Sequence, residues 1–434
     1  MPEIELFTLL SDFFTSLLAA VPSRCRATLL ELLIGLLQAP SAHLTDVIWA
    51  IWALGADKHF TTYYWFVRKA KWSWLALLAA WLRVTVHWVD EKVITLIIDD
   101  FIVPRSSKKA PGVTSHYDHA KKSNRPDYLN GQGWVIFSRV IEKAGRIGAI
   151  HLGCRLIRRL GNRSKLKTAR LIGELAFPFF EGHVLRLLID AWYMKSPLVV
   201  PLLKQFPNLH VIGQVRHDTA LFHVPTAEEQ PKKQGRKKIY GKKVQFDELP
   251  EQAIKLTLYS KEQTVRYRSC ECVARFLKGR RVRAVWVLLE DAAKWKLLLS
   301  TNPELTPVEV MTGYDRRWKV EPAINDFKNR FGLLEAWQQS RQTLARWVAL
   351  LTVSYSFVKL LAILLPTDSK NLIPSIPWRA GKPITAAWMR LAIIRLFSGF
   401  RLLPESRRNI GRFYHRLIPE WLAKQQQQIN QTKT

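Results

Sequence analysis

Hydrophobic residues recur at helical spacing in the first part of the chain. Leu6–Leu18, Ala27–Leu37 and Asp46–Leu54 each carry an apolar face, and prolines separate the first three runs. A basic, tryptophan-rich segment, Lys58–Val89, follows them. We therefore expect residues 1–90 to be helical. Helices with exposed lysines and aromatic rings suit DNA binding and a purely structural scaffold equally well, and the pattern leaves both open.

Beyond this region the apolar residues form short β-branched runs, which are typical of strands. The expected order is strand, strand, strand, helix, strand, helix, strand, with a basic loop at Pro104–Gln132 after the first strand. This order favours a mixed sheet with helices on its faces. The expected strands are Val93–Ile98, Trp134–Val140, Gly148–Leu152, Val184–Ile189 and Leu209–Val215, and the helices are Lys165–Phe177 and Ser196–Phe206.

The pattern changes again after residue 215. Three strand-like runs, Ile254–Tyr259, Val282–Leu289 and Lys294–Leu299, predict a β-rich insertion. The rest of the chain is helical in pattern. We therefore divide the chain into a helical region at 1–90, the first part of the sheet core at 91–215, a basic β-rich insertion at 216–300, a further core segment at 301–365 and a basic helical region at 366–434.

The charge balance changes what these elements are expected to bind. The chain has 66 Lys and Arg residues against 35 Asp and Glu, a formal net charge of +31. Such an excess indicates a polyanionic partner, with nucleic acid ahead of an anionic membrane. One basic tract, Pro231–Val244, is expected to contact DNA, although a solvated loop is the alternative. Its cations are Lys232, Lys233, Arg236, Lys237, Lys238, Lys242 and Lys243.

Two apolar runs bear on a membrane location. Trp72–Val86 and Leu350–Pro366 are both shorter than the roughly 20 residues that a membrane span needs, so we expect buried core helices. The acidic N-terminus lacks the basic region of an export signal. The four cysteines form no CxxC pair, so we infer neither a zinc site nor a disulfide framework. A reducing, cytoplasmic location fits these features.

One predicted helix carries a distinctive set of side chains. Thr306-Pro307-Val308-Glu309 has the form of an N-cap with a capping box, and Gly332 is a plausible stop. Between them, four residues fall within roughly 60° of one another on a helix. They are Tyr314, Arg317, Glu321 and Lys328. Pro322 should kink this helix. A carboxylate among cations suits a site for metal and phosphate, whereas the simplest alternative is a solvated face of a basic helix.

Further carboxylates follow two of the predicted strands. Asp99 and Asp100 come directly after Val93–Ile98, and Asp190 comes directly after Val184–Ile189. Functional groups gather at the carboxyl ends of strands in such sheets. If these positions meet Glu321 in space, three carboxylates could hold two divalent ions about 3.5–4 Å apart. Magnesium prefers such an oxygen-rich setting.

These motifs together resemble the DDE transposases of bacterial insertion sequences. Tyr314, Arg317, Glu321 and Lys328 match the Y-x2-R-x3-E-x6-K signature of one group at every gap. Three further stretches, in the expected order, are similar to its other motifs, and the resemblance covers roughly residues 90–365. They are VITLIIDDF at Val93–Phe101 with PGV at Pro111–Val113, LLIDAWY at Leu187–Tyr193, and VIGQVRHDTALF at Val211–Phe222 with GRKKIYG at Gly235–Gly241.

The resemblance implies a ribonuclease H-like mixed sheet with flanking helices, a β-strand insertion before the glutamate helix, and helical N- and C-terminal regions. It implies metal-dependent cleavage at transposon ends and attack of the freed 3′-hydroxyl on target DNA. Asp190 and Glu321 would be metal ligands, with Asp99 or Asp100 as the third. Asp99 is favoured because it directly follows the apolar run. Phe101 stands where the family often has a small hydroxyl residue, so the alignment of this stretch with the family's first motif can shift by one residue.

The same resemblance implies the partners. The expected cofactor is Mg²⁺, two ions with Mn²⁺ able to substitute, and Tyr314, Arg317 and Lys328 would contact phosphates near the transposon end. The expected substrates are double-stranded terminal inverted repeats and target DNA, bound by a homodimer at synapsis in the bacterial cytoplasm and nucleoid, with no membrane. Related enzymes stack a flipped base on an aromatic ring, for which Trp286 and Trp295 are candidates unless they are core residues.

Three other functions remain as alternatives. A different two-metal nuclease or a resolvase would share the carboxylates but would not join strands. A DNA-binding relative without catalysis is possible, although every carboxylate position is filled. A basic protein of the membrane surface would need amphipathic helices that bind anionic lipid.

Overall fold

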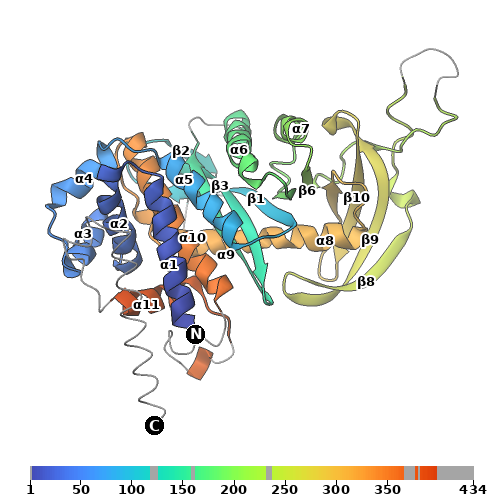
Figure 1. Ribbon diagram of the computed structural model, residues 1–434. Coiled ribbons are helices and arrows are strands. Elements are labelled where there is room, and N and C mark those ends of the chain that lie inside the picture. The colour runs from blue at the N-terminus through green and yellow to red at the C-terminus, as the bar shows by residue number, and fades with distance from the viewer. Residues whose placement is uncertain are drawn as a thin grey trace, which may run out of the picture.

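The computed structural model describes residues 2–117, 126–157, 162–230, 237–365, 377–379 and 382–397. Its strands form one mixed sheet, with helices on both faces and at one end (Figure 1). The strands are β1 Val93–Pro104, β2 Val113–Tyr117, β3 Tyr128–Lys143, β4 Arg146–Leu156, β5 Val184–Ile189, β6 Leu209–Val215, β7 Leu221–Phe222, β8 Glu251–Leu258, β9 Lys261–Ala274, β10 Arg280–Leu289 and β11 Lys296–Ser300. The α-helices are α1 Pro2–Ala19, α2 Ser23–Gln38, α3 Leu44–Ala53, α4 Phe60–Arg68, α5 Trp74–Trp88, α6 Asn162–Ala176, α7 Ser196–Gln205, α8 Pro307–Asp315, α9 Val320–Asn329, α10 Arg341–Leu364 and α11 Ala386–Phe397.

Strand β1 lies at the centre of the core. It pairs with β3 antiparallel on one side and with β5 parallel on the other, and β5 pairs with β6 in parallel. β4 extends the β3 edge as a hairpin, turning at Ala144 and Gly145, which both have positive φ. The expected mixed sheet with flanking helices is confirmed.

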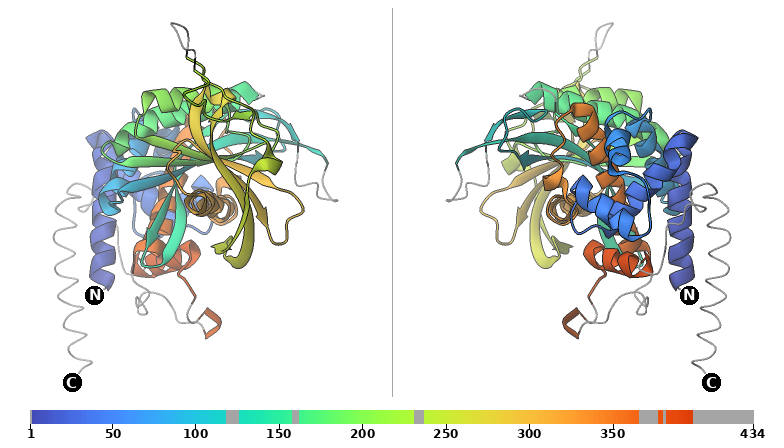
Figure 2. Two further views of the ribbon diagram at one scale, coloured as in Figure 1. Left: turned by 90° about the vertical axis from the view of Figure 1, so that its right-hand side faces the viewer. Right: turned by 90° about the vertical axis from the view of Figure 1, so that its left-hand side faces the viewer.

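The insertion strands continue the same sheet. β11 pairs with β6, and β10, β9 and β8 follow as antiparallel neighbours. In Figure 1 these strands lie at the right-hand end of the molecule, while α1 to α5 and α11 lie at the left-hand end. The two further views in Figure 2 show the insertion and the N-terminal helices on opposite sides of the core.

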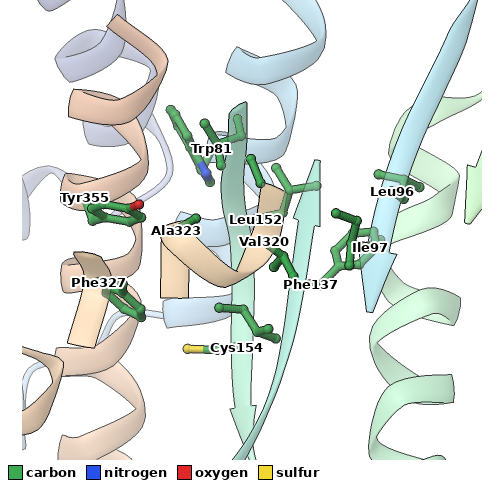
Figure 3. Packing of buried hydrophobic residues seen from close by; sticks show 14 of the residues in the cluster. Trp81, Leu96, Ile97, Phe137, Leu152, Cys154, Val320, Ala323, Phe327 and Tyr355 are labelled. Atoms are coloured by element: carbon green, nitrogen blue, oxygen red, sulfur yellow. The ribbon is translucent and has the colours of Figure 1, made fainter. Parts of the chain in front are cut away.

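Helix α10 is buried between the N-terminal helices and the β3–β4 side of the sheet. In the described residues, one helix, Arg341–Leu364, is long and apolar enough to cross a membrane, and 94% of its most apolar window is buried inside the protein. Its Tyr355 ring stacks on Phe327 of α9, with the ring centroids 5.4 Å apart. Figure 3 shows Val320, Ala323 and Phe327 of α9 packed between Tyr355 and strand β4. This apolar packing fixes the position of α9, and therefore of Glu321, relative to the sheet.

Arginines close the carboxyl ends of three helices of the N-terminal region. Arg139 of β3 donates to the carbonyls of Thr85 and Val89 at the end of α5, at 2.7 and 2.6 Å. Arg346 of α10 does the same at the end of α4, and Arg390 of α11 at the end of α2. A cation there satisfies unpaired carbonyls and opposes the helix dipole. These contacts join the N-terminal helices to β3, α10 and α11.

Three expectations about strands were wrong. The strand that begins at Val93 does not end before Asp99, because β3 continues to pair with it as far as Pro104. Only its parallel pairing with β5 stops at Ile98. The expected basic loop contains a strand, β2, which pairs with β3. The sequence pattern also missed β9, whose alternating charged residues conceal its length.

The expected single helix carrying the signature residues is divided into two. Thr306 and Glu309 form the predicted capping box of α8, but the chain tightens into a 3-10 turn at Arg316–Lys319 before α9 begins. Pro322 explains the break, since it cannot donate to the carbonyl four residues earlier and its ring would clash with that carbonyl. The stop near Gly332 is confirmed, with α9 ending at Asn329 and Gly332 at φ 75°.

Candidate active site

Arg317 joins two of the predicted catalytic carboxylates. Its Nη1 lies 3.1 Å from Oδ2 of Asp99, and its Nη2 lies 3.3 Å from Oε1 of Glu321. Asp99 reaches this point from the middle of β1, and the other two residues come from the 3-10 turn and the first turn of α9. The tightened turn therefore brings a guanidinium and a carboxylate of the signature against the central strand.

Burial dominates the electrostatics of this group. It raises the pKa of Asp99 from 3.8 to about 7, against the opposing effects of Arg317 and a hydrogen bond from the Asp100 amide, while Asp190 and Asp100 raise it further. Burial also raises the pKa of Glu321, again opposed by Arg317. Burial thus favours the protonated form of both carboxyl groups, and a cation bound nearby would favour the ionised form.

Asp190 lies at the end of β5 on the same side as Arg317. Its Oδ1 accepts hydrogen bonds from the amides of Trp192 and Tyr193, at 2.9 and 3.0 Å, which fix the turn after the strand. Its negative charge helps to raise the pKa values of Asp99 and Arg317. Asp99 and Glu321 thus meet on Arg317, and Asp190 lies near enough for its charge to act on Asp99 and Arg317.

Asp100 faces the other side of the sheet, as alternation along a strand requires. It accepts a hydrogen bond from the Tyr193 hydroxyl at 3.1 Å and forms an ion pair with Lys165 of α6. Lys165 also lies over the Trp192 ring, 4.3 Å from its centroid. This geometry favours Asp99 over Asp100 as the partner of Glu321.

Lys165 and Tyr193 were not among the predicted site residues. The only sequence signal for Tyr193 is its place within LLIDAWY, three residues after Asp190. Lys165 is one of several cations near the start of α6, and nothing in the sequence distinguishes it from its neighbours. Its contact with Asp100 joins residues far apart in the chain and depends on how α6 packs on the sheet.

The other signature residues have different surroundings. Tyr314 is buried at 5% exposure, which raises its pKa to about 12, and its ring lies 5.7 Å from the Arg317 guanidinium. Lys328 lies over the ring of Phe101, 6.0 Å from its centroid. Phe101 stands two residues beyond Asp99 on the same face of β1, so Lys328 also points toward the acidic side of the site.

The predicted DNA-contacting tract is described only in part. Lys237 and Lys238 are exposed, and the backbone of Lys238 is held by two hydrogen bonds to the Gln230 side chain, both 3.0 Å. Lys232, Lys233 and Arg236 lie outside the described residues. Of the two tryptophans considered for base stacking, Trp286 is a core residue at 5% exposure, and Trp295 packs against Phe246 with centroids 5.1 Å apart.

The donor atoms of the site suit a hard divalent cation. Asp99, Asp190 and Glu321 offer carboxylate oxygens, the ligands that magnesium prefers. In the described part of the chain, however, no three acidic, histidine or cysteine side chains are grouped closely enough to hold a metal ion. Arg317 occupies the position between Asp99 and Glu321, so a cation and this guanidinium would compete for the same oxygens.

Comparisons with known proteins agree with part of the resemblance. Residues 16–143 match the family described as DDE superfamily endonuclease, a stretch that includes Asp99 and Asp100 but ends before Asp190 and Glu321. No curated protein sequence matches the chain. A cryo-EM structure of piggyBac transposase in a synaptic complex with hairpin DNA is similar at 14% identity and a TM-score of 0.33.

That similarity covers 73% of this chain and 56% of the piggyBac chain, and a TM-score of this size does not establish a common fold. The match therefore shows that residues 16–143 are similar to the DDE superfamily endonucleases. The narrower group with the Y-x2-R-x3-E-x6-K signature stays a prediction.

Proposed function

We propose that this chain is a DDE transposase that binds the ends of its own insertion sequence, cleaves them and joins the 3′-hydroxyl ends to target DNA. The observation that carries the proposal is the meeting of Asp99 and Glu321 on Arg317, with Asp190 beside them. The net charge of +31 and the DDE superfamily match support it.

Arg317 has two roles in this proposal. In the free protein it neutralises Asp99 and Glu321. With DNA bound, it turns to a phosphate, because a guanidinium binds carboxylate and phosphate with the same fork of donors. Asp99 and Glu321 are then free to bind a metal cation. Lys165 keeps Asp100 occupied on the other side of the sheet, so that Asp99 and Asp100 act separately.

Asp99, Asp190 and Glu321 would hold the divalent cation, Mg²⁺ with Mn²⁺ able to substitute. When bound, it supplies activation of the attacking oxygen and stabilisation of the leaving oxygen. In the first reaction water attacks the phosphorus and the 3′-oxygen leaves as a hydroxyl. In the second, this hydroxyl attacks the phosphorus of a target phosphodiester, the bond from that phosphorus to the target's 3′-oxygen breaks, and the 3′-oxygen leaves as a hydroxyl. The cations of the chain position both DNA segments, which is most of what phosphodiester displacement requires from a protein.

End cleavage by a Glu321→Gln variant tests the proposal. Labelled DNA carrying the inverted repeats that flank the gene is incubated with the protein and Mg²⁺. The wild type should cut at the repeat ends, and the variant should lose at least about 100-fold in rate while still binding DNA. Glu174→Gln, which changes a half-buried carboxylate of α6 paired with Arg170, is the matched control and should cut normally.

The outcomes separate the alternatives. Cleavage without joining of the labelled 3′ end to a second DNA would indicate a nuclease or resolvase. Binding without cleavage by the wild type would indicate a DNA-binding relative. If Glu321→Gln cuts as well as the wild type, the assignment of this site is wrong.

A further inference from the structure

The β8–β9 hairpin of the insertion touches the segment that carries Arg317. β8 and β9 are joined by a two-residue turn, Tyr259 and Ser260, and we call these two residues the hairpin tip. The amide of Tyr259 donates to Oδ1 of Asp315, at 2.7 Å. Asp315 ends α8 and stands two residues before Arg317. The insertion therefore reaches the candidate active site through a hydrogen bond from its backbone to a carboxylate.

The hairpin tip has a conformation that its own residues do not favour. Tyr259 and Ser260 have φ values of 55° and 63°, so both lie in the left-handed region. A two-residue hairpin turn of this kind usually contains Asn and Gly, because most other side chains are strained there. Such strain persists only where the surrounding structure holds it. Contacts made by the hairpin tip, rather than its own preference, must therefore keep it in this shape.

Asp315 supplies one of these contacts at the expense of a local one. It is the N-cap of the 3-10 turn Arg316–Lys319, where an aspartate side chain ordinarily accepts from an amide of the turn itself. Among the described residues, its side chain makes no such capping hydrogen bond. The carboxylate binds the Tyr259 amide instead, and a hydrogen bond to a charged acceptor is stronger than one between neutral groups. Asp315 therefore serves the contact with the insertion.

Aromatic rings extend this contact to Arg317. The Tyr259 ring meets the Trp318 ring edge to face, with centroids 5.6 Å apart, and Trp318 directly follows Arg317. The central guanidinium carbon of Arg317 lies 5.4 Å from the Trp318 centroid and 5.7 Å from the Tyr314 centroid. A guanidinium is attracted to aromatic rings at such distances. Rings as well as carboxylates therefore hold Arg317, and one of these rings rests on the hairpin tip.

The Tyr259 side chain is also in electrostatic range of the site. Burial raises the pKa of its hydroxyl, and the negative charges of Asp315 and Glu321 raise it further, whereas Arg317 opposes them. The side chain is 37% exposed, so it lies at the edge of the site rather than beneath it. A residue of the insertion is thus a close neighbour of the signature residues.

We propose that Asp315 and the hairpin tip, Tyr259 and Ser260, position the side chains of the candidate active site. Asp315 holds the hairpin tip against the 3-10 turn, and the Tyr259 ring supports Trp318 there. Trp318 fixes the place from which Arg317 reaches its two carboxylates and, with DNA bound, a phosphate. This inference rests on the proposed function, because it concerns the same site, but its contacts can be tested without DNA.

End cleavage by variants of Asp315 tests the positioning role. Asp315→Ala removes the acceptor and should slow cleavage about 10- to 100-fold with DNA binding retained, because a small displacement of a site residue is enough for such a loss. Asp315→Asn keeps an acceptor oxygen for the Tyr259 amide and should recover most of the rate. Asp291→Ala is the matched control: Asp291 contacts the same hairpin through an ion pair with Lys261, and its loss should leave cleavage normal.

Ser260→Gly separates positioning from a purely structural role. Glycine adopts positive φ without strain, so this change should stabilise the hairpin tip in the absence of the Asp315 carboxylate. Added to Asp315→Ala, it should raise the melting temperature again but should not restore the cleavage rate. Recovery of both would show that Asp315 only stabilises the hairpin, and the proposal would be wrong. It would also be wrong if Asp315→Ala cut like the wild type, or if Asp315→Asn were as slow as Asp315→Ala.

Hydrogen–deuterium exchange of the free protein decides the inference even if the wild type does not cut DNA. In Asp315→Ala, the amides of residues 316–321 should exchange at least about 10-fold faster than in the wild type, whereas Asp315→Asn and Asp291→Ala should match the wild type. This exchange pattern without wild-type cleavage would overturn the proposed function and support the positioning contact. Unchanged exchange at residues 316–321 in Asp315→Ala would overturn the contact itself.

Discussion

At the scale of single residues, the site depends on one buried aspartate. Asp99 has a side chain only 15% exposed, shares Arg317 with Glu321, and has a pKa of about 7 because of its burial. The folded chain thus holds a proton on Asp99 that the unfolded chain releases near pH 3.8. Between these two values the folded state binds more protons, so the free energy of unfolding contributed by Asp99 falls as the pH rises.

Because the contribution of Asp99 to the free energy of unfolding falls as the pH rises, Asp99→Asn should stabilise the protein at neutral pH. In EDTA at pH 7.5, the variant should gain roughly 1–4 kcal/mol in free energy of unfolding, because it removes a buried charge. The gain should shrink toward pH 4. Urea unfolding across this range measures it, with Asp90→Asn, an exposed aspartate, as the control. A variant that is less stable than the wild type at pH 7.5 would contradict this account of the site.

At the scale of elements, whether a strand could be predicted from the sequence depended on how buried that strand is. β5 and β6 have the predicted bounds, Val184–Ile189 and Leu209–Val215, because both lie inside the sheet and consist mainly of buried aliphatic residues. β9 was missed because its outward positions carry charges that neighbouring strands pair, as between Glu251 and Arg266. Such pairs are not visible in a single segment of sequence.

The site also contains some contacts that the sequence predicts and others that it does not. The spacing of the signature residues placed Arg317 and Glu321 together, since they lie near one another on any helical turn. It could not show that Pro322 tightens the preceding turn, nor that Arg317 reaches Asp99 across 218 residues of chain. The role of Lys165 follows only from how α6 packs. Local spacing is readable from sequence, whereas contacts between elements depend on their packing.

The buried arginines give a prediction about these elements. Arg139→Ala should lower the free energy of unfolding by about 2–4 kcal/mol, because it leaves the Thr85 and Val89 carbonyls and the Glu91 carboxylate without their donor. Arg170→Ala, on the surface of α6, should cost less than about 1 kcal/mol. Urea unfolding of the two variants would measure the difference, and equal costs would show that Arg139 does not join α5 to the sheet.

At the scale of the whole molecule, the net charge of +31 should dominate DNA binding. The logarithm of the binding constant should fall linearly with the logarithm of salt concentration. Replacing both Lys237 and Lys238 with Gln should reduce that slope by about 2 if each lysine contacts a phosphate. Lys204→Gln on α7 is a single-charge control. Fluorescence anisotropy at several salt concentrations measures the slopes, and an unchanged slope would remove the tract from the DNA surface.

Arg346 caps the carboxyl end of α4, and this contact affects how the protein folds during its synthesis. The Arg346 guanidinium caps the carbonyls of Val67, Ala70 and Trp72, residues that leave the ribosome more than 270 positions earlier. At ordinary synthesis rates that interval is on the order of tens of seconds. Throughout it, the nascent N-terminal helices lack α10, against which they pack. These early-translated helices are therefore among the last parts of the chain to become stable, and chaperones that bind apolar helices have long access to them.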